Sequence, residues 1–355
     1  MKKVAFFSKN LEIGGMEKSL IILINELSKI YKVYLYLEEK TGPLLNLVND
    51  NITIKEYKIS KNTNAFFRKS YNYIKRFIWK LFKKNYFDFS CCYATYSIPC
   101  SKLALIASKN NSLYVHSDYY NFYEKDIEKI KCFFNSINVS KFKNVIFVSN
   151  ESRDNFCKVY NNVNTKVINN LIDYKNIIKL SKKIVNFKFS TTKINILYVG
   201  RLDNSSKNFD LLLDSFKIAN NPNLNLFFVG SGTYKNNIEK FIQKYNLNNQ
   251  IKLLGETINP YPYIKNSDYL ILTSKYEGFP VIYNEALVLN KSFITTIPVT
   301  DDEIDVKDFF KIVKDKKELI DLLKNLNKQY NDYKVDFERI NNTRINKLIE
   351  LIEEK

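Results

Sequence analysis

The sequence has few of the residues that bind metal ions or form disulfides. Among 355 residues there is one histidine, His116, and there are five cysteines, none of them in a Cys-x-x-Cys pair. An odd number of scattered cysteines and a single imidazole argue against a zinc site and a disulfide framework, and they favour a reducing compartment. We therefore expect no structural metal.

Long apolar segments are also missing. No run of 18 apolar residues occurs, and the apolar segment after Lys2 and Lys3 is too short to be the core of a signal peptide. We expect a cytoplasmic protein, and a peripheral contact with the inner face of the plasma membrane stays open.

Acidic residues are few compared with basic ones. The chain has 55 Lys and Arg against 37 Asp and Glu, which gives a net charge of +18. Such a charge suits a nucleic acid, an anionic membrane surface or an anionic substrate. Glycine is scarce, at 8 residues, whereas Lys, Asn, Ile, Tyr and Phe are abundant, so the codon bias of an AT-rich genome is an alternative explanation. The position of the charges is therefore more informative than their sum.

The length and the pattern of apolar runs indicate two domains. A chain of 355 residues exceeds one ordinary core, and strands alternate with helices, which predicts parallel α/β sheets. We expect a first domain at 1–173, a linker rich in Lys, Asn and Ser at 174–192, and a second domain at 193–330. A C-terminal helix at 331–355 is expected to pack back on the first domain.

One stretch of the second half combines a strand, a turn and a helix that carries a carboxylate. The apolar run 269–273 predicts a strand, Gly278 and Pro280 mark the turn, and the residues after them predict a helix. Glu277 and Glu285 bracket this turn. Open α/β sheets bind ligands where the carboxyl ends of strands meet helix N-termini. The stretch is therefore the first candidate for a binding site.

Seven residues separate Glu277 from Glu285, with a Gly-Phe-Pro turn after the first and an alanine after the second. This pattern resembles the E-x7-E signature of retaining GT-B glycosyltransferases of the group 1, or family 4, type, as found in bacterial surface-polysaccharide synthesis. The resemblance implies an α/β fold in which two Rossmann-like domains with parallel sheets face each other across a cleft. It also implies that Glu285 binds the donor ribose. Glu277, with the turn Gly278, Phe279 and Pro280, would hold the donor sugar.

Two further elements of the second half fit a donor diphosphate. A strand ends in Gly-Arg at Arg201, and Lys207 follows at the start of a helix, so that a guanidinium and an ammonium can reach one diphosphate. This order resembles the G-R-L and K-N elements of the family. Gly230 and Gly232 follow the next strand and resemble the glycine loop on the nucleotide side. The alternative is that both cations are solvated surface residues.

The first half holds two candidates for the same site. Gly14 and Gly15 follow the first strand and resemble the first glycine-rich loop of the family, near the donor phosphate, although the dinucleotide fingerprint G-x-G-x-x-G is absent. A plain tight turn is the alternative. His116 ends a predicted strand and resembles the histidine that faces the donor sugar. A purely structural histidine is its alternative.

The segment 66–87 carries seven Lys and Arg residues and no acidic residue, with aromatic and aliphatic residues between them at near-helical spacing. A basic aromatic helix of this kind can lie on an anionic bilayer. The alternative is an ordinary amphipathic helix whose apolar stripe is buried in the core and whose cations are solvated.

The resemblance implies sugar transfer with retention, from a UDP-sugar in preference to a GDP-sugar, to a lipid-linked or growing cell-surface polysaccharide such as a capsule. No Asp-x-Asp motif is present, so Arg201 and Lys207 would stabilise the leaving diphosphate without a metal or other cofactor. A GT-B nucleotide-sugar epimerase is one alternative. The other is a non-enzymatic nucleic-acid or polyanion binder, although we expect no specific nucleic-acid partner.

Overall fold

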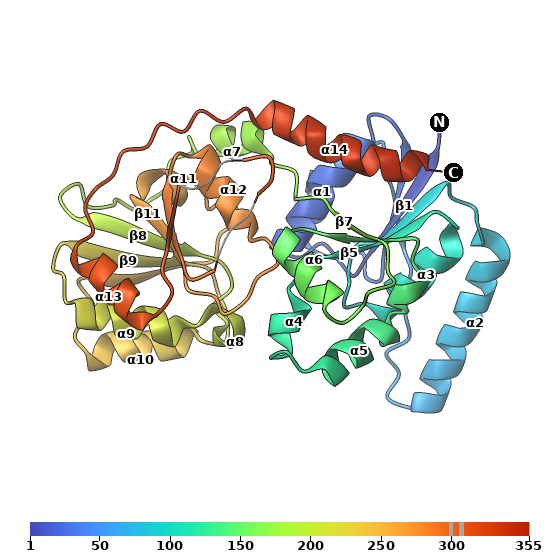
Figure 1. The fold of residues 1–355 in the computed structure, drawn as a ribbon, viewed down its shortest axis with the longest axis horizontal. Helices are drawn as coiled ribbons and strands as arrows, with labels where there is room; N and C mark the ends of the chain where they lie inside the picture. Colours follow the sequence, from blue (N-terminus) through green and yellow to red (C-terminus); the bar gives the residue numbers. More distant parts are fainter. Residues whose placement is uncertain (298–300, 305–308, 355) are drawn as a thin grey trace. The chain divides into compact units, whose positions relative to one another are not determined.

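A computed structural model describes residues 1–297, 301–304 and 309–354 (Figure 1). The chain forms two compact units. The first comprises Met1–Leu171 together with the segment from Glu338 to the C-terminus, and the second comprises Ile172–Phe337. Each unit is built on its own parallel sheet.

The sheet of the first unit has the strand order β3-β2-β1-β4-β5-β6-β7, and all paired strands are parallel. Its strands are β1 (Lys3–Ser8), β2 (Lys32–Leu37), β3 (Thr53–Glu56), β4 (Phe89–Cys92), β5 (Asn111–Val115), β6 (Asn144–Phe147) and β7 (Thr165–Val167). The central strands are buried nearly throughout, as expected of parallel strands covered on both faces. The order reverses between β1 and β4, which marks the carboxyl edge there as the usual place for a ligand.

The helices of the first unit connect these strands. They are α1 (Gly15–Leu27), η1 (Pro43–Leu47), α2 (Ala65–Lys83), α3 (Ile98–Ala107), α4 (Tyr119–Phe122), α5 (Ile127–Ser136), η2 (Val139–Lys141), α6 (Asn150–Cys157) and, at the end of the chain, α14 (Phe337–Glu353).

Helix α14, red in Figure 1, ties the end of the chain to the first unit. The side chain of Arg344 is fully buried, and its Nη1 donates to the carbonyl of Asn170 at 2.6 Å. Asn110 donates to the carbonyl of Leu351 at 2.8 Å, and the Tyr31 hydroxyl donates to Glu353 at 2.8 Å. The chain therefore leaves the first unit after β7 and returns to it for its last helix.

The sheet of the second unit has the order β10-β9-β8-β11-β12-β13, again with parallel pairs only. Its strands are β8 (Ile194–Val199), β9 (Leu224–Val229), β10 (Ile251–Gly255), β11 (Tyr269–Leu272), β12 (Ser292–Thr295) and β13 (Phe310–Ile312). Its helices are α7 (Tyr174–Leu180), α8 (Asn204–Lys207), α9 (Phe209–Ala219), α10 (Lys235–Lys244), α11 (Tyr261–Asn266), α12 (Val281–Val288) and α13 (Lys316–Lys324). The order reverses between β8 and β11.

Two parallel α/β sheets confirm the predicted fold class. The segment 174–192, expected to be a linker, differs from expectation because it contains α7 and belongs to the second unit. Buried Ile177 and the packing of α7 on α11 and α12 explain this, since a helix with its own core contacts is part of a domain. Among the residues that the structure describes, no helix is both long and apolar enough to cross a membrane.

Candidate functional site

The carboxyl edge of the second sheet brings together the loops that the sequence singled out. Strands β8, β9 and β11 are neighbours around the point where the strand order reverses. Arg201 follows β8, Gly230 and Gly232 follow β9, and Glu277 lies in the turn after β11. This is the position at which parallel sheets with such a reversal bind ligands.

Lys207 and Glu277 form an ion pair at this edge. The ammonium of Lys207 binds Oε1 of Glu277, and Ser274 Oγ donates to the same oxygen at 2.7 Å. Only 17% and 18% of the two side chains are exposed, so the pair is largely shielded from water. An ammonium has three donors, which leaves Lys207 able to bind a further anion beside Glu277.

Two more hydrogen bonds hold the turn after β11 against the helix that contains Lys207. Thr273 Oγ1 donates to the carbonyl of Lys207 at 3.1 Å, and the backbone N–H of Lys275 donates to the carbonyl of Ser206 at 2.8 Å. The ion pair is therefore fixed from the backbone on both sides. The sequence predicted both charges but gave no sign that they would pair with each other.

Arg201 differs from Lys207 in that its side chain is 74% exposed. Its Nη2 lies 4.0 Å from Asp203 Oδ2, while its backbone carbonyl accepts a hydrogen bond from the Tyr198 hydroxyl at 2.9 Å. Burial raises the pKa of this hydroxyl well above its ordinary value, so Tyr198 stays a hydrogen-bond donor. The backbone at Arg201 is thus fixed, and its guanidinium projects into solvent.

The glycines after β9 allow two loops to approach closely. Gly230 has φ +146°, and a Cβ placed on it would lie 1.9 Å from the carbonyl oxygen of Gly200. A Cβ on Gly232 would lie 2.2 Å from the carbonyl oxygen of Leu202. Ser231 accepts the N–H of Leu202 at 2.8 Å, which holds the two loops together. No other residue type fits these two positions without moving the backbone of the loop after β8.

Glu285 lies within α12 and is only 5% exposed. The hydroxyl of Tyr261, at the start of α11, hydrogen-bonds to its carboxylate. Burial, together with the charges of Glu285 and Asp173, raises the pKa of Tyr261 far above its ordinary value. Tyr261 is therefore a permanent donor that orients the predicted ribose ligand.

Sequence reasoning missed both Tyr261 and Asp173. Nothing in their spacing from Glu285 points to them, because helices α7, α11 and α12 come together only in the folded unit. The one usable signal for Tyr261 was its place in the segment that follows β10, since the carboxyl ends of strands collect ligand contacts.

The Gly-Phe-Pro turn leads directly into α12. Phe279 is buried and packs edge-on against Tyr283, with ring centroids 6.0 Å apart. Pro280 caps the helix with φ −64°. The buried ring of Phe279 is not available to a ligand, and the positive end of the helix dipole favours an anion or a hydroxyl oxygen at this turn. Gly278, which precedes this anchored pair, is partly exposed.

In the first unit, Gly14 and Gly15 lie at the start of α1. Gly14 has φ −160°, an extended conformation that any residue adopts, and a Cβ there would meet only the flexible carboxylate of Glu17. Neither the backbone conformation nor a lack of space requires glycine at position 14, so a tight turn does not explain why glycine occurs there.

His116 follows β5 and lies against two tyrosine rings. Its ring centroid is 4.2 Å from that of Tyr93 and 4.9 Å from that of Tyr114, the latter stacked at 9°. Nε2 is buried and has no hydrogen-bond partner among the described residues. Burial lowers the pKa of His116 to about 3, which keeps the imidazole neutral.

A buried hydrogen-bonded chain supports the ring that His116 contacts. The Tyr93 hydroxyl donates to Ser19 Oγ at 2.9 Å, and Ser19 donates to Asn170 Oδ1 at 2.6 Å. Arg344 binds the carbonyl of the same asparagine. Helix α14 is thereby coupled to the surroundings of His116. That Gly14, Gly15 and His116 face the second unit across a cleft stays a prediction.

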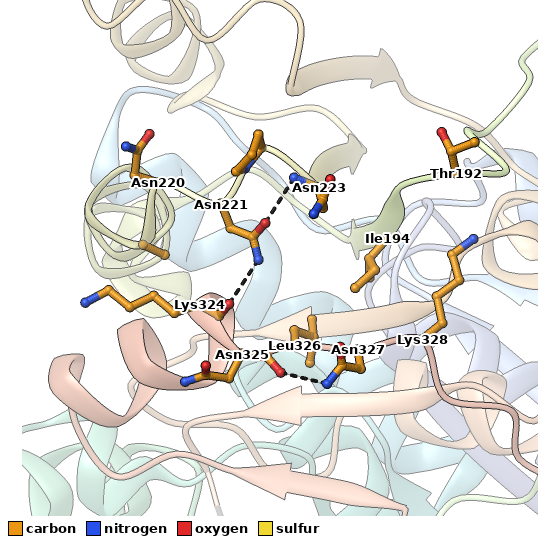
Figure 2. A pocket seen from close by; sticks show the side chains of 12 residues that line it. Thr192, Ile194, Asn220, Asn221, Asn223, Lys324, Asn325, Leu326, Asn327 and Lys328 are labelled. Carbon is orange, nitrogen blue, oxygen red and sulfur yellow. Dashed lines mark hydrogen bonds between the residues drawn. The ribbon is translucent and has the colours of Figure 1, made fainter.

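A cavity of about 740 Å³ lies elsewhere in the second unit, at the amino ends of β8 and β9 (Figure 2). Its wall is made of asparagines and lysines around 220–223 and 324–328, with Thr192 and Ile194. It contains none of the predicted site residues. Among the described residues, no group of three or more His, Cys, Asp or Glu side chains could hold a metal ion.

Residues 181–335 match the family model described as Glycosyl transferases group 1. The second unit carries a group 1 glycosyltransferase domain. This confirms the resemblance that the glutamate pattern indicated. The match covers nearly all of the second unit and therefore includes Arg201, Lys207, Glu277 and Glu285.

Curated proteins that resemble part of this chain carry similar names. An uncharacterized glycosyltransferase of Methanocaldococcus jannaschii is 34% identical over 140 residues, which is 37% of this chain and 34% of that one. The N-acetylgalactosamine-N,N'-diacetylbacillosaminyl-diphospho-undecaprenol 4-alpha-N-acetylgalactosaminyltransferase of Campylobacter jejuni is 30% identical over 131 residues, again 37% of this chain and 34% of that one. The chain thus spans about a third of the length of these relatives.

Solved structures resemble the chain over its full length. A mutant of TarM from S. aureus, in complex with fondaparinux, alpha-GlcNAc-glycerol and UDP, has a TM-score of 0.74 at 13% identity and covers 100% of both chains. HepE from Anabaena, in complex with UDP and glucose, has a TM-score of 0.72 at 16% identity, with 98% of this chain and 100% of that one covered. These likenesses show that the chain has the GT-B fold.

Proposed function

We propose that the chain is a retaining, metal-independent glycosyltransferase that uses a UDP-sugar rather than a GDP-sugar. The single observation that carries the proposal is the shielded pair of Lys207 and Glu277 beside the glycine loop, in a group 1 glycosyltransferase domain. A cation and a carboxylate side by side suit the diphosphate and the sugar of one donor molecule. The presence of UDP in the TarM and HepE structures supports uridine as the base.

The donor would lie along the carboxyl edge of the second sheet. Glu285, oriented by Tyr261, accepts hydrogen bonds from the two ribose hydroxyls. Lys207 and the exposed guanidinium of Arg201 bind the diphosphate, and Glu277 accepts hydrogen bonds from hydroxyls of the sugar. The close approach at Gly230 and Gly232 keeps these loops in register.

In the proposed reaction, the bond between the anomeric carbon and the diphosphate oxygen breaks, and the acceptor oxygen bonds to the same carbon on the same face. The acceptor proton passes to the departing phosphate, so the anomeric configuration is retained. Lys207 and Arg201 stabilise the negative charge that develops on the diphosphate, in place of a metal ion. Burial lowers the pKa of His116 to about 3, so the imidazole stays neutral and can act only as a hydrogen-bonding group, not as a cation.

The proposed acceptor is a lipid-linked or growing cell-surface polysaccharide, met at the cytoplasmic face of the membrane. The Campylobacter relative is named for a diphospho-undecaprenol substrate, and a Staphylococcus aureus relative for capsular polysaccharide biosynthesis. A lipid-linked acceptor places the reaction at a bilayer surface, so a peripheral contact with anionic lipid belongs to the proposal.

Thermal-shift measurements with UDP, GDP and an oligonucleotide test the proposal and its rivals. We expect UDP to raise the melting temperature most, because only UDP matches the donor that we propose. A shift with the oligonucleotide alone would favour the polyanion binder that the charge of +18 suggests. Turnover of a UDP-sugar into its epimer without any acceptor would favour the epimerase.

A further inference from the structure

Helix α2 has no buried residue, although aromatic and aliphatic side chains make up about half of it. It spans Ala65–Lys83, and its first turn is capped by Asn64, whose side chain accepts the N–H groups of Phe66 and Phe67. In Figure 1 it is the light-blue helix at one edge of the first unit. Within that unit, the helix is attached along only one face.

Three polar side chains lie on the attached face of α2. Asn72 accepts the N–H of Ser60 at 2.8 Å, Lys75 donates to the carbonyl of Lys58 at 2.7 Å, and Arg68 donates to the carbonyl of Asn62 at 2.9 Å. These three side chains follow one another at helical spacing and use the backbone of the preceding loop as their partner.

Trp79 completes the attached face. Its ring packs edge-on against Tyr36 and Tyr57, at centroid distances of 4.8 and 5.6 Å, and against Phe7 at 6.0 Å. The only tryptophan of the chain therefore anchors α2 to the core of the first unit. No residue of α2 is buried, so the sequence-based alternative is wrong in placing the apolar stripe of the helix in the core.

The opposite face of α2 is apolar and exposed to solvent. Between 48% and 73% of each large apolar side chain on it is exposed. Its members include Phe66, Phe67, Ile74, Phe77, Leu81 and Phe82. A contiguous apolar surface of this size marks an interaction site rather than ordinary surface.

The charge around this face identifies its partner. Between Lys58 and Phe87 there are nine Lys and Arg residues and no Asp or Glu. Lys69 and Lys80 are exposed, and their helical positions place them along one border of the apolar face, while exposed Lys84 directly follows the helix. A second copy of the helix would bring like charges together, whereas anionic lipid headgroups complement them.

We propose that α2 docks on an anionic bilayer with its apolar face toward the acyl chains and its bordering lysines among the headgroup phosphates. The helix lies in the plane of the interface rather than across it, with its apolar face about 5–10 Å into the headgroup boundary. The role of this docking in bringing the enzyme to a lipid-linked acceptor rests on the proposed function. The lipid contact itself is carried by α2 alone.

Co-sedimentation of the full chain with vesicles tests the docking. We expect binding to phosphatidylcholine vesicles that contain phosphatidylglycerol, and little binding to phosphatidylcholine alone. Replacing Phe77→Ser and Leu81→Ser together should weaken binding at least about tenfold, because both side chains leave the acyl region. The matched control, Ile30→Ser with Ile127→Ser, removes two comparably exposed apolar residues of the same unit and should change nothing.

The face assignment has its own readout in the fluorescence of Trp79. Because this ring packs against Tyr36 and Tyr57, we expect brominated lipids to quench it weakly in bound protein. Strong quenching would overturn the orientation. Binding that ignores lipid charge and the two serine replacements would overturn the docking itself. The docking would also be overturned if the wild type were a dimer without lipid and the two serine replacements dissociated that dimer.

These outcomes are separate from the fate of the proposed transferase activity. UDP binding that persists in a chain without lipid affinity would refute the docking and leave the donor site intact. Lipid binding without any nucleotide binding would refute the donor site and leave the docking intact.

Discussion

Replacing Gly230 by alanine should destabilise the second unit, because the loop after β8 leaves no room for a Cβ there. A Cβ at this position would lie 1.9 Å from the carbonyl oxygen of Gly200, and carbon and backbone oxygen cannot approach within about 3 Å. The loops after β8 and β9 must therefore separate by about 1 Å. Overpacking of this kind costs about 1–3 kcal/mol, and the positive φ costs about 1 kcal/mol more.

The expected loss of about 2–4 kcal/mol corresponds to a melting temperature lowered by about 5–15 °C for a unit of this size. Gly255→Ala is the matched control. Gly255 also has a positive φ, +82°, but a Cβ there meets nothing within 4 Å, so only the conformational cost of about 1 kcal/mol applies. Differential scanning calorimetry of both variants measures the difference. Equal melting temperatures for the two would refute the claim that close approach of the loops, rather than backbone conformation, requires Gly230.

Other variants test the neighbouring groups. Lys207→Met should weaken UDP binding about 10–100-fold in calorimetric titrations, since a hydrogen bond from a charged group contributes about 1.5–3 kcal/mol, while the exposed Lys240→Met should have no effect. Tyr261→Phe should weaken UDP binding several-fold because Glu285 loses the donor that orients it. Arg344→Met should lower the free energy of unfolding by about 2–4 kcal/mol in urea, and Arg344→Lys by less; wild-type stability in the methionine variant would contradict the role of the buried guanidinium.

The low pKa of His116 gives a prediction for pH. The unfolded chain binds a proton near pH 6.5, whereas the folded chain binds it only near pH 3, so stability is fully present above pH 6.5 and is lost as the pH falls. Between pH 7.5 and 5.5 the wild type should lose about 1 kcal/mol more than His116→Phe in urea titrations. If the free energy of unfolding had the same pH dependence in both proteins, the lowered pKa of His116 would be contradicted.

Much of this fold could be predicted from the order of strands and helices in the sequence. The apolar runs at 194–199 and 269–272 predicted buried parallel strands, and both are present as β8 and β11. The start of the second unit was harder to predict from the sequence. The composition of 174–192 is that of a linker, but Ile177 finds a buried place against helices more than 80 residues away in the sequence, which no local pattern reveals.

The sequence could point to individual candidate residues of the site, but it could not show which of them contact one another. Motif spacing indicated Lys207 and Glu277 separately, yet their ion pair depends on the adjacency of β8 and β11 in the sheet. Tyr261 could not be found, because its partner lies on another helix. The roles of Glu277, Glu285 and His116 stay predictions.

Helix α2 shows a different limit of sequence reasoning. Periodicity predicted an amphipathic helix but could not tell which face meets the protein. Hydrophobic periodicity alone favours an apolar face toward the core. Here Trp79 and three polar side chains attach the helix, and the apolar face is left outside. The aromatic cluster that receives Trp79 forms from strands β1 and β2 and the residue after β3, which only the folded sheet brings together.

Isothermal titration of the full chain with UDP tests the central claim most directly. We predict that the wild type binds UDP more tightly than GDP, and that Glu285→Ala, shown by its melting curve to be folded, binds UDP about 100-fold more weakly, because two ribose hydroxyls lose a charged acceptor. Glu239→Ala, on the exposed side of α10, should bind as the wild type does. Unchanged UDP affinity in Glu285→Ala, or a wild type that binds neither nucleotide, would contradict the account.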